Sequence, residues 1–182
     1  MADVAVIGGG PAGLSAALFT AKNGHDTTLF DTDETWMHKA HLYNYLGIDD
    51  IGGTEFVERG REQVDEFGVE RHDAEVTDVE ETGSGFSLRT QDGEYDADYV
   101  VFAAGGSRDL AADLGCDRND DGTVAVVNQD NETTVDRAYA AGRMIRDQKI
   151  EAIISAGDGA AAALGIMSAE AGKPVHDFDT PE

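Results

Sequence analysis

A glycine-rich turn between an apolar run and a helical run constrains this chain most strongly. The apolar run extends from Asp3 to Ile7 and is typical of a strand that is buried on both faces. The turn GGGPAG follows at residues 8–13. The pattern then predicts a helix from Pro11 to Asn23, which Gly24 ends, and a second strand from His25 to Phe30.

The spacing of the glycines gives this unit a predicted function. Gly8, Gly10 and Gly13 occupy the three positions of G-x-G-x-x-G. In that motif the first glycine makes a tight turn, the second lets a pyrophosphate approach the backbone, and the third packs helix against strand. Asp31 ends the second strand, where a carboxylate accepts hydrogen bonds from ribose hydroxyls. Dinucleotide binding is favoured over a structural turn, although two more acids follow closely, and any one of the three could be a loop acid.

The remaining elements are predicted from hydrophobic periodicity. Glu55 to Phe67 has apolar residues at helical spacing and predicts an amphipathic helix that Gly68 ends. The segment from Val79 to Gly106 alternates apolar and polar residues between glycine turns, which indicates an antiparallel meander. The other predictions are a buried strand at Tyr99–Ala103, a linker at 110–122, strands at Thr123–Val127 and Ala138–Ala141, and a helix at Ala152–Ala171.

The charge of the chain excludes several classes of partner. Its 182 residues include 13 Lys and Arg against 37 Asp and Glu, a formal net charge of −24. This surface repels phosphate backbones and anionic lipids, so we predict no nucleic-acid partner and no membrane partner. The acids are spread along the chain. They indicate a salt-accumulating halophile, since about 1 M salt shortens the Debye length to roughly 3 Å; an unusually acidic mesophilic protein is the alternative.

The N-terminus lacks the features of a signal peptide, because it has no basic region and only a short apolar stretch. No apolar run approaches 18 residues. We therefore expect a cytoplasmic protein.

Four motifs occur in order along most of the chain. They are GGGPAGLSAALFTAKNG, HLYNYLGIDDIGGTEFVERGREQVDEFGVE, VVFAAGG and TTVDRAYAAGRMIRDQKIEAIISAGDGAAAAL. Together they resemble the FAD-binding domain of thioredoxin-reductase-like flavoproteins, in the pyridine-nucleotide-disulfide oxidoreductase superfamily. The resemblance implies an α/β, three-layer, Rossmann-like fold with a central parallel sheet, helices on one face and a β-meander on the other. It implies a single domain over 1–182, with an N-terminal part at 1–109, the linker at 110–122 and a C-terminal part at 123–182.

The chain departs from the family pattern in four respects. The family inserts an NAD(P)H-binding domain between the VVFAAGG-like motif and the last motif, whereas only 32 residues lie between Gly106 and Tyr139 here. The family's redox-active cysteine pair is missing, because Cys116 is the only cysteine. The family's Gly-Asp is Gly142-Arg143 here, and the threonine of its VVFAAGG-like motif is Ala104. Arg143 either reaches the FAD pyrophosphate or marks the loss of tight binding.

The resemblance also implies roles for individual residues. Backbone N–H groups at 148–150, at the entrance to the last helix, would favour negative charge near flavin N1 and the C2 carbonyl; an ordinary packed helix is the alternative. Asn44 would contact the isoalloxazine, unless it is a plain turn residue, and Val76 would offer backbone groups to adenine. The complete predicted cofactor-binding set is Gly8, Gly10, Pro11, Ala12, Gly13, Asp31, Asn44, Val76, Ala104, Gly105, Gly142, Arg143, Gln148, Lys149 and Ile150.

Other side chains with possible chemical roles are expected to be structural or to lie at the surface. His38 and His41 are three residues apart and could share a helical face, but two histidines alone make a poor metal site. We expect surface or supporting roles, with proton donation near reduced flavin as the alternative. No metal is predicted, and Cys116 is expected to be an inert thiol because only Arg118 could lower its pKa. The predicted packing aromatics, one of which would alternatively stack on the flavin, are Trp36, Tyr43 and Tyr45.

The leading functional hypothesis is an FAD-dependent oxidoreductase that passes electrons from NAD(P)H or a protein donor through FAD to an unknown acceptor. The resemblance further implies a homodimer, because loss of the inserted domain would expose an apolar face. The alternative is a non-catalytic module that binds FAD or a nucleotide, or a redox sensor within a complex. A third hypothesis, an NAD-binding dehydrogenase, uses only the first motif.

Overall fold

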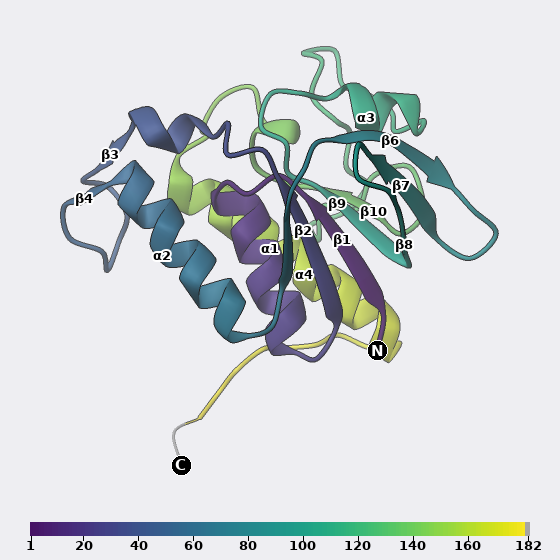
Figure 1. Cartoon of the computed structure of the whole chain (residues 1–182), viewed down its shortest axis with the longest axis horizontal. Helices are drawn as coiled ribbons and strands as arrows, with labels where there is room; N and C mark the ends of the chain where they lie inside the picture. The colour runs from purple at the N-terminus through teal and green to yellow at the C-terminus, as the bar shows by residue number, and fades with distance from the viewer. Residues whose placement is uncertain (181–182) are drawn as a thin grey trace.

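A five-stranded parallel sheet forms the centre of the computed structural model, which describes residues 1–180 (Figure 1). The strand order is β10–β9–β1–β2–β5, and every neighbouring pair is parallel. After β1, the chain adds β2 and β5 on one side of β1 and later adds β9 and β10 on its other side. The carboxyl ends of β1 and β9 therefore flank the crevice where open α/β sheets bind ligands. The strands are β1 (Asp3–Ile7), β2 (Asp26–Asp31), β5 (Glu70–Asp73), β9 (Tyr99–Phe102) and β10 (Ala138–Ala140).

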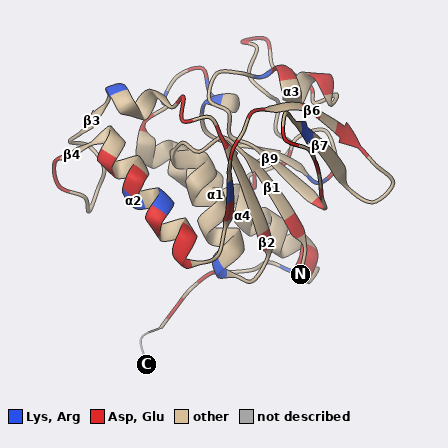
Figure 2. Ribbon diagram, in the orientation of Figure 1, with Lys and Arg blue, Asp and Glu red and all other residues tan. Residues whose placement is uncertain are grey.

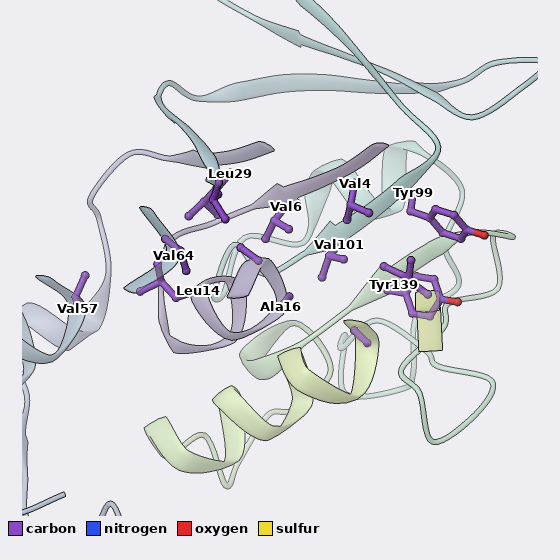
Figure 3. Close-up of a cluster of buried hydrophobic side chains, with 14 of the residues drawn as sticks. Val4, Val6, Leu14, Ala16, Leu29, Val57, Val64, Tyr99, Val101 and Tyr139 are labelled. Carbon is purple, nitrogen blue, oxygen red and sulfur yellow. The ribbon is translucent and has the colours of Figure 1, made fainter. Parts of the chain in front are cut away.

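Three helices cover one face of this sheet: α1 (Pro11–Lys22), α2 (Gly53–Glu66) and α4 (Ala152–Ala171) (Figure 1). Alternate residues of β1 divide the core, because successive side chains of a strand point to opposite faces. Val4 and Val6 belong to the cluster on the helix side, which Figure 3 shows. Ala5 and Ile7 belong to the cluster on the opposite side.

Small residues let α1 and α4 pack closely. A Cβ atom at Gly159 would overlap the backbone carbonyl oxygen of Ala12, so this crossing excludes any side chain at that position. By length and composition, α4 is the one helix within residues 1–180 that could span a membrane. Half of its most apolar stretch is buried within the protein, which is the pattern of a core helix.

An antiparallel meander covers the other face of the sheet. It consists of β6 (Val76–Glu81), β7 (Phe86–Thr90) and β8 (Glu94–Ala97). Its inward side chains pack in the same buried cluster as Ala5 and Ile7 of β1. The predicted three-layer α/β architecture is confirmed. One short helix, α3 (Asp109–Asp113), packs against β6 and so lies on the meander side.

The connection from β9 to β10 differs from its prediction. Most of α3 lies in the segment expected to be a linker, and the expected strand at Thr123–Val127 is absent. Only isolated bridges form there, including Arg118 with Val124. The Asp121 side chain accepts hydrogen bonds from the backbone N–H and the hydroxyl of Thr123, and such local bonds compete with a strand ladder.

Acidic side chains lie on helices, strands and loops in all layers rather than in one tail (Figure 2). The short elements near the carboxyl end of the sheet are the 3₁₀-helices η1 (Trp36–Lys39) and η2 (Gly142–Met144) and the hairpin strands β3 (His41–Leu42) and β4 (Ile51–Gly52).

Candidate functional site

A cavity of about 580 Å³ lies at the carboxyl end of the parallel sheet. Its lining comes from the segments that follow β1, β2, β5 and β9, together with η2 and the first turn of α4. This volume is within the usual range for small-molecule and cofactor sites. The cavity therefore occupies the position that the strand order predicts for a ligand.

Glycines shape the floor of the cavity. Gly8 has a φ of +111°, and a Cβ there would overlap the carbonyl oxygen of Ala103, just beyond β9. A Cβ at Gly13 would overlap the carbonyl oxygen of Gly8. These contacts press the turn against both β9 and α1. Gly10 differs, because a Cβ at this position would meet only the Thr35 hydroxyl, at 3.4 Å, and would otherwise face open space. The open space beside Gly10 would allow a diphosphate to approach the backbone.

Two helix N-termini face the cavity without a side-chain cap. Helix α1 begins after Gly10 and α4 begins after Glu151, and neither of these residues makes a capping hydrogen bond through a side chain. Pro11, Ala12 and Ser155 from the first turns line the cavity. The first N–H groups of a helix have no partner within it and carry the positive end of the helix dipole. The cradle therefore fits an anionic dinucleotide.

A charged network closes the β2 end of the cavity. Arg61 reaches from α2 and donates to Asp31 at 2.6 Å and to Asp33 at 2.5 Å. The side chains of Asp31 and Arg61 are only 15% and 20% exposed. Hydrogen bonds from Arg61 and then His38 hold the pKa of Asp33 below its usual value. A Cβ at Gly9 would overlap the Asp31 carboxylate, so this end is tightly packed.

The η2 end of the cavity is built differently. The Arg143 guanidinium stacks over the Trp36 ring, with its carbon 4.4 Å from the ring centroid. Arg108 holds the backbone of η2 by donating to the carbonyl oxygens of Arg143 at 2.8 Å and Met144 at 3.1 Å. Gly142 has a φ of +64°. A Cβ there would lie 3.0 Å from the Ala12 side chain, so η2 is placed directly against the start of α1.

The structure brings ten of the fifteen predicted cofactor-binding residues to this cavity. Gly13 and Gly142 lie just behind the lining in the packing contacts described above. Asn44 is exposed in the loop after β3, and Gln148 and Lys149 are exposed before α4. The ten lining residues are Gly8, Gly10, Pro11, Ala12, Asp31, Val76, Ala104, Gly105, Arg143 and Ile150.

Sequence reasoning missed several lining residues. Most are small or contribute backbone, and they follow strand ends that the topology, rather than a motif, brings together. A rule that marks the residues after each parallel strand could have found some of them. Trp36 was named only as an alternative, and the residues missed altogether are Ile7, Gly9, Phe30, Thr32, Glu34, Thr35, Met37, Ala74, Glu75, Ala103, Gly106, Ser107, Leu110, Ala152 and Ser155.

The two histidines do not share a helical face, so that expectation is wrong. His38 is in η1, which ends at Lys39, and His41 is in β3. His38 bonds to Asp33 and Thr54, whereas His41 bonds to Asp50. No group of three or more His, Cys, Asp or Glu side chains within residues 1–180 is arranged to hold a metal.

Cys116 is buried and its thiol contacts the Thr133 hydroxyl at 3.4 Å. Burial raises the pKa of this thiol. The Cys116 thiol is therefore held in its protonated, unreactive form.

Comparisons with known proteins agree with this geometry. The thioredoxin reductase of Peptoclostridium litorale is 37% identical over 118 residues, which is 63% of this chain and 36% of the relative. The Helicobacter pylori strain J99 enzyme is 34% identical over 113 residues, 59% of this chain and 36% of the relative. The chain thus spans little more than a third of the length of the curated relatives it matches.

Solved structures share the fold across nearly the whole chain. A thioredoxin reductase from Gloeobacter violaceus superposes with a TM-score of 0.87 at 17% identity, covering 100% of this chain and 99% of that one. The family model described as pyridine nucleotide-disulphide oxidoreductase matches residues 2–49 and 53–160. The chain therefore belongs to the pyridine nucleotide-disulphide oxidoreductase family, as a thioredoxin-reductase-like dinucleotide-binding domain.

Proposed function

We propose that the chain binds FAD in this cavity and works as an FAD-dependent oxidoreductase. The observation that carries the proposal is the convergence of two uncapped helix N-termini on a glycine-lined cavity at the carboxyl edge of the sheet. Bound FAD would supply the capacity to accept and release electrons. Electrons would come from NAD(P)H or a redox protein and pass to an acceptor that the chain's own residues do not identify.

The residues of the cavity divide the work of holding FAD. The start of α1 would hold the diphosphate through the backbone N–H groups of Gly10 and Ala12, since Pro11 has none. Asp31 would accept from ribose hydroxyls, and the backbone at Val76 would face adenine. The N-terminus of α4, close to Ile150, would favour negative charge on the flavin. Asn44, Gln148 and Lys149 are exposed outside the cavity lining, and contacts from them would require these loops to fold inward over the flavin.

The connection between β9 and β10 bears on how an electron donor could reach the flavin. This connection contains only the short helix α3 and isolated bridges, in the position where the family carries its NAD(P)H-binding domain. Free NAD(P)H or a protein donor would therefore approach the flavin without a domain inserted in this connection. Transfer through an internal cysteine pair is excluded, because Cys116 has no second cysteine in the sequence.

A non-catalytic FAD-binding or nucleotide-binding module, acting as a sensor in a complex, is the second candidate. The observation that favours it is Arg143 in place of the family's aspartate. We also propose a cytoplasmic protein of a salt-accumulating cell, on the basis of the acidic composition and the N-terminal sequence, and a homodimer, on the basis of the family resemblance. Light scattering of the protein eluting from a sizing column in about 2 M KCl, which screens the acidic surface, tests the dimer.

A visible absorbance spectrum tests FAD binding. We expect oxidised-flavin bands and one FAD per chain after purification in about 2 M KCl or reconstitution with FAD. Gly10→Val is expected to abolish binding by filling the space beside α1, while Gly83→Val, at an open turn, keeps it. A folded wild-type protein that cannot be loaded with FAD contradicts the proposal.

Anaerobic stopped-flow reduction separates the two candidates. Bleaching of the loaded protein by NADH, NADPH or a reduced electron carrier, followed by reoxidation by an added acceptor, supports the oxidoreductase. FAD that binds but is reduced by none of these favours the non-catalytic module.

A further inference from the structure

Arg143 differs from every other arginine of the chain. Its guanidinium makes no hydrogen bond or ion pair with any residue in the described range 1–180, although the chain has 37 acidic residues. It is half-buried, and its one partner is the face of Trp36. The eight arginines that donate to oxygen atoms are Arg59, Arg61, Arg71, Arg89, Arg108, Arg118, Arg137 and Arg146.

The Trp36–Arg143 pair joins two sides of the cavity. Trp36 is in η1, which follows β2, whereas Arg143 is in η2, which follows β10. Strands β2 and β10 lie on opposite sides of the β1–β9 pair, and both residues line the cavity. The indole is 69% exposed, so the stacked pair lies toward the outside of the site.

Hydrogen bonds and packing hold the backbone around Arg143, whereas no hydrogen bond within the described residues holds its guanidinium. Arg108 holds the carbonyl oxygens of η2, and Gly142 is packed against Ala12 in the first turn of α1. The guanidinium is therefore tethered beside the helix N-terminus where a diphosphate would lie. Among the described residues that line the cavity, Arg143 is the only basic one, against the acidic Asp31, Glu34 and Glu75.

We propose that Trp36 and Arg143 form a clasp that opens when a nucleoside diphosphate binds. Without ligand, the guanidinium stacks on the indole; with ligand, it leaves the indole and pairs with the diphosphate. The exchange is favourable because a charge-assisted bidentate hydrogen bond to phosphate is stronger than an exposed cation–π contact. This inference rests on the proposed dinucleotide function, and it assigns to Arg143 a contact that replaces the family's aspartate.

Fluorescence of the protein tests the clasp, because Trp36 is the only tryptophan. ADP is the probe, since it carries the diphosphate without a flavin that would quench the indole by itself. We expect ADP to change the intensity or wavelength of Trp36 emission at constant salt, and adenosine, which lacks phosphate, to leave it unchanged. Arg143→Gln is expected to change the emission of the ligand-free protein and to remove its response to ADP.

Equilibrium dialysis of ADP measures the new contact directly. We expect Arg143→Gln to weaken ADP binding about 10- to 100-fold, as for loss of a hydrogen bond between charged groups. Arg59→Gln is the matched control, because Arg59 is an exposed arginine on α2 outside the cavity. Trp36→Phe is expected to leave ADP binding equal or a few-fold tighter, because phenylalanine holds the guanidinium less strongly.

Two results overturn the clasp. One is wild-type ADP affinity in Arg143→Gln, and the other is a tenfold loss in Trp36→Phe, which would place the indole directly on the ligand. Loading with FAD separates these results from failure of the proposed function. A wild-type protein that binds FAD while Arg143→Gln binds ADP normally keeps the function and loses the clasp; one that binds neither FAD nor ADP loses both.

Discussion

The two ends of the cavity use arginine in opposite ways. At the β2 end, Arg61 is largely buried and bonded to Asp31 and Asp33. At the η2 end, Arg143 has no oxygen partner within the described residues and rests on the exposed ring of Trp36. One terminal nitrogen of Arg61 pairs with both carboxylates, although its buried Nε has no hydrogen-bond partner within the described residues. The N–H donors of the Arg143 guanidinium make no hydrogen bond within the described residues, so they are available to bind a ligand.

This difference separates contributions to folding from contributions to binding. Removing Arg61 would leave two carboxylates close together with no cation between them, which disfavours the folded state. Removing Arg143 would uncover part of an indole that is already mostly in solvent. The first arginine should therefore affect the free energy of unfolding, and the second should affect ligand affinity.

The largest expected effect comes from comparing Arg61→Ala with Arg143→Ala. We expect Arg61→Ala to lower the free energy of unfolding by about 2 to 3 kcal/mol, because it strands the partly buried Asp31. Arg143→Ala should stay within about 0.5 kcal/mol of the wild type. Urea unfolding at one fixed KCl concentration measures both. Equal losses in the two variants would remove the distinction between the ends.

Glycine substitutions compare the packing of the same two ends. Gly9→Ala should cost about 1 to 2 kcal/mol of unfolding free energy, because its Cβ overlaps the Asp31 carboxylate and must push it from Arg61. Gly106→Ala should change stability by less than about 0.5 kcal/mol, since its Cβ meets only the Arg143 side chain, at 3.6 Å. Thermal unfolding of both variants is the measurement; a larger loss at Gly106 would show that the η2 end is the rigid one.

The smallest expected effect is on how the free energy of unfolding changes with pH in the acidic range. Arg61 and His38 lower the pKa of Asp33, so the folded protein favours the ionised carboxyl more than the unfolded chain does. The resulting stability is present above the unfolded pKa of about 3.9 and is lost as pH falls through the lower folded-state value. Between about pH 5 and pH 3, the unfolding free energy of the wild type should therefore fall more steeply than that of Arg61→Ala.

Two other carboxyls have a lowered pKa, and neither affects this comparison. Hydrogen bonds from Thr123 lower the pKa of Asp121, and both proteins keep those bonds. Arg71 lowers the pKa of Asp65, and both proteins keep that pair. Urea titrations across the pH range give the two slopes. Parallel slopes would mean that Arg61 does not stabilise the Asp33 carboxylate.

The elements that could be predicted are those whose sequence pattern lies within the element itself. The strand at Asp3–Ile7 and the helix at Ala152–Ala171 match their predictions, because apolar runs, glycine stops and helical periodicity lie within each segment. The strand at Thr123–Val127 fails, although its residues favour β structure, because sheet preference depends on a neighbouring strand. The spacing of His38 and His41 fits a helix, but the backbone at Ala40 is extended and ends η1 between them.

The unpredicted parts of the site join residues that are distant in sequence. Arg61 lies 30 residues from Asp31, and Arg143 lies 107 residues from Trp36. No local pattern pairs them, since their meeting depends on the order of strands in the sheet. The glycine motif was readable because its three glycines have a fixed spacing within one βαβ unit, although the backbone that Gly8 contacts, at Ala103, lies outside that unit. The partners of Arg61 and Arg143, by contrast, could be identified only once the order of strands in the sheet was known.

The path from β9 to β10 has a consequence for how such a protein can gain or lose parts. These strands are parallel neighbours, so the connection leaves at the carboxyl end of β9 and crosses over to re-enter the sheet at the amino end of β10. A folded unit whose own ends lie close together could be grafted into this connection without changing the sheet. The core and the cavity floor depend on strand pairing and helix packing on either side of the graft. The β9–β10 connection is therefore a position at which such a domain could gain or lose a folded module while the sheet and the cavity floor stay unchanged.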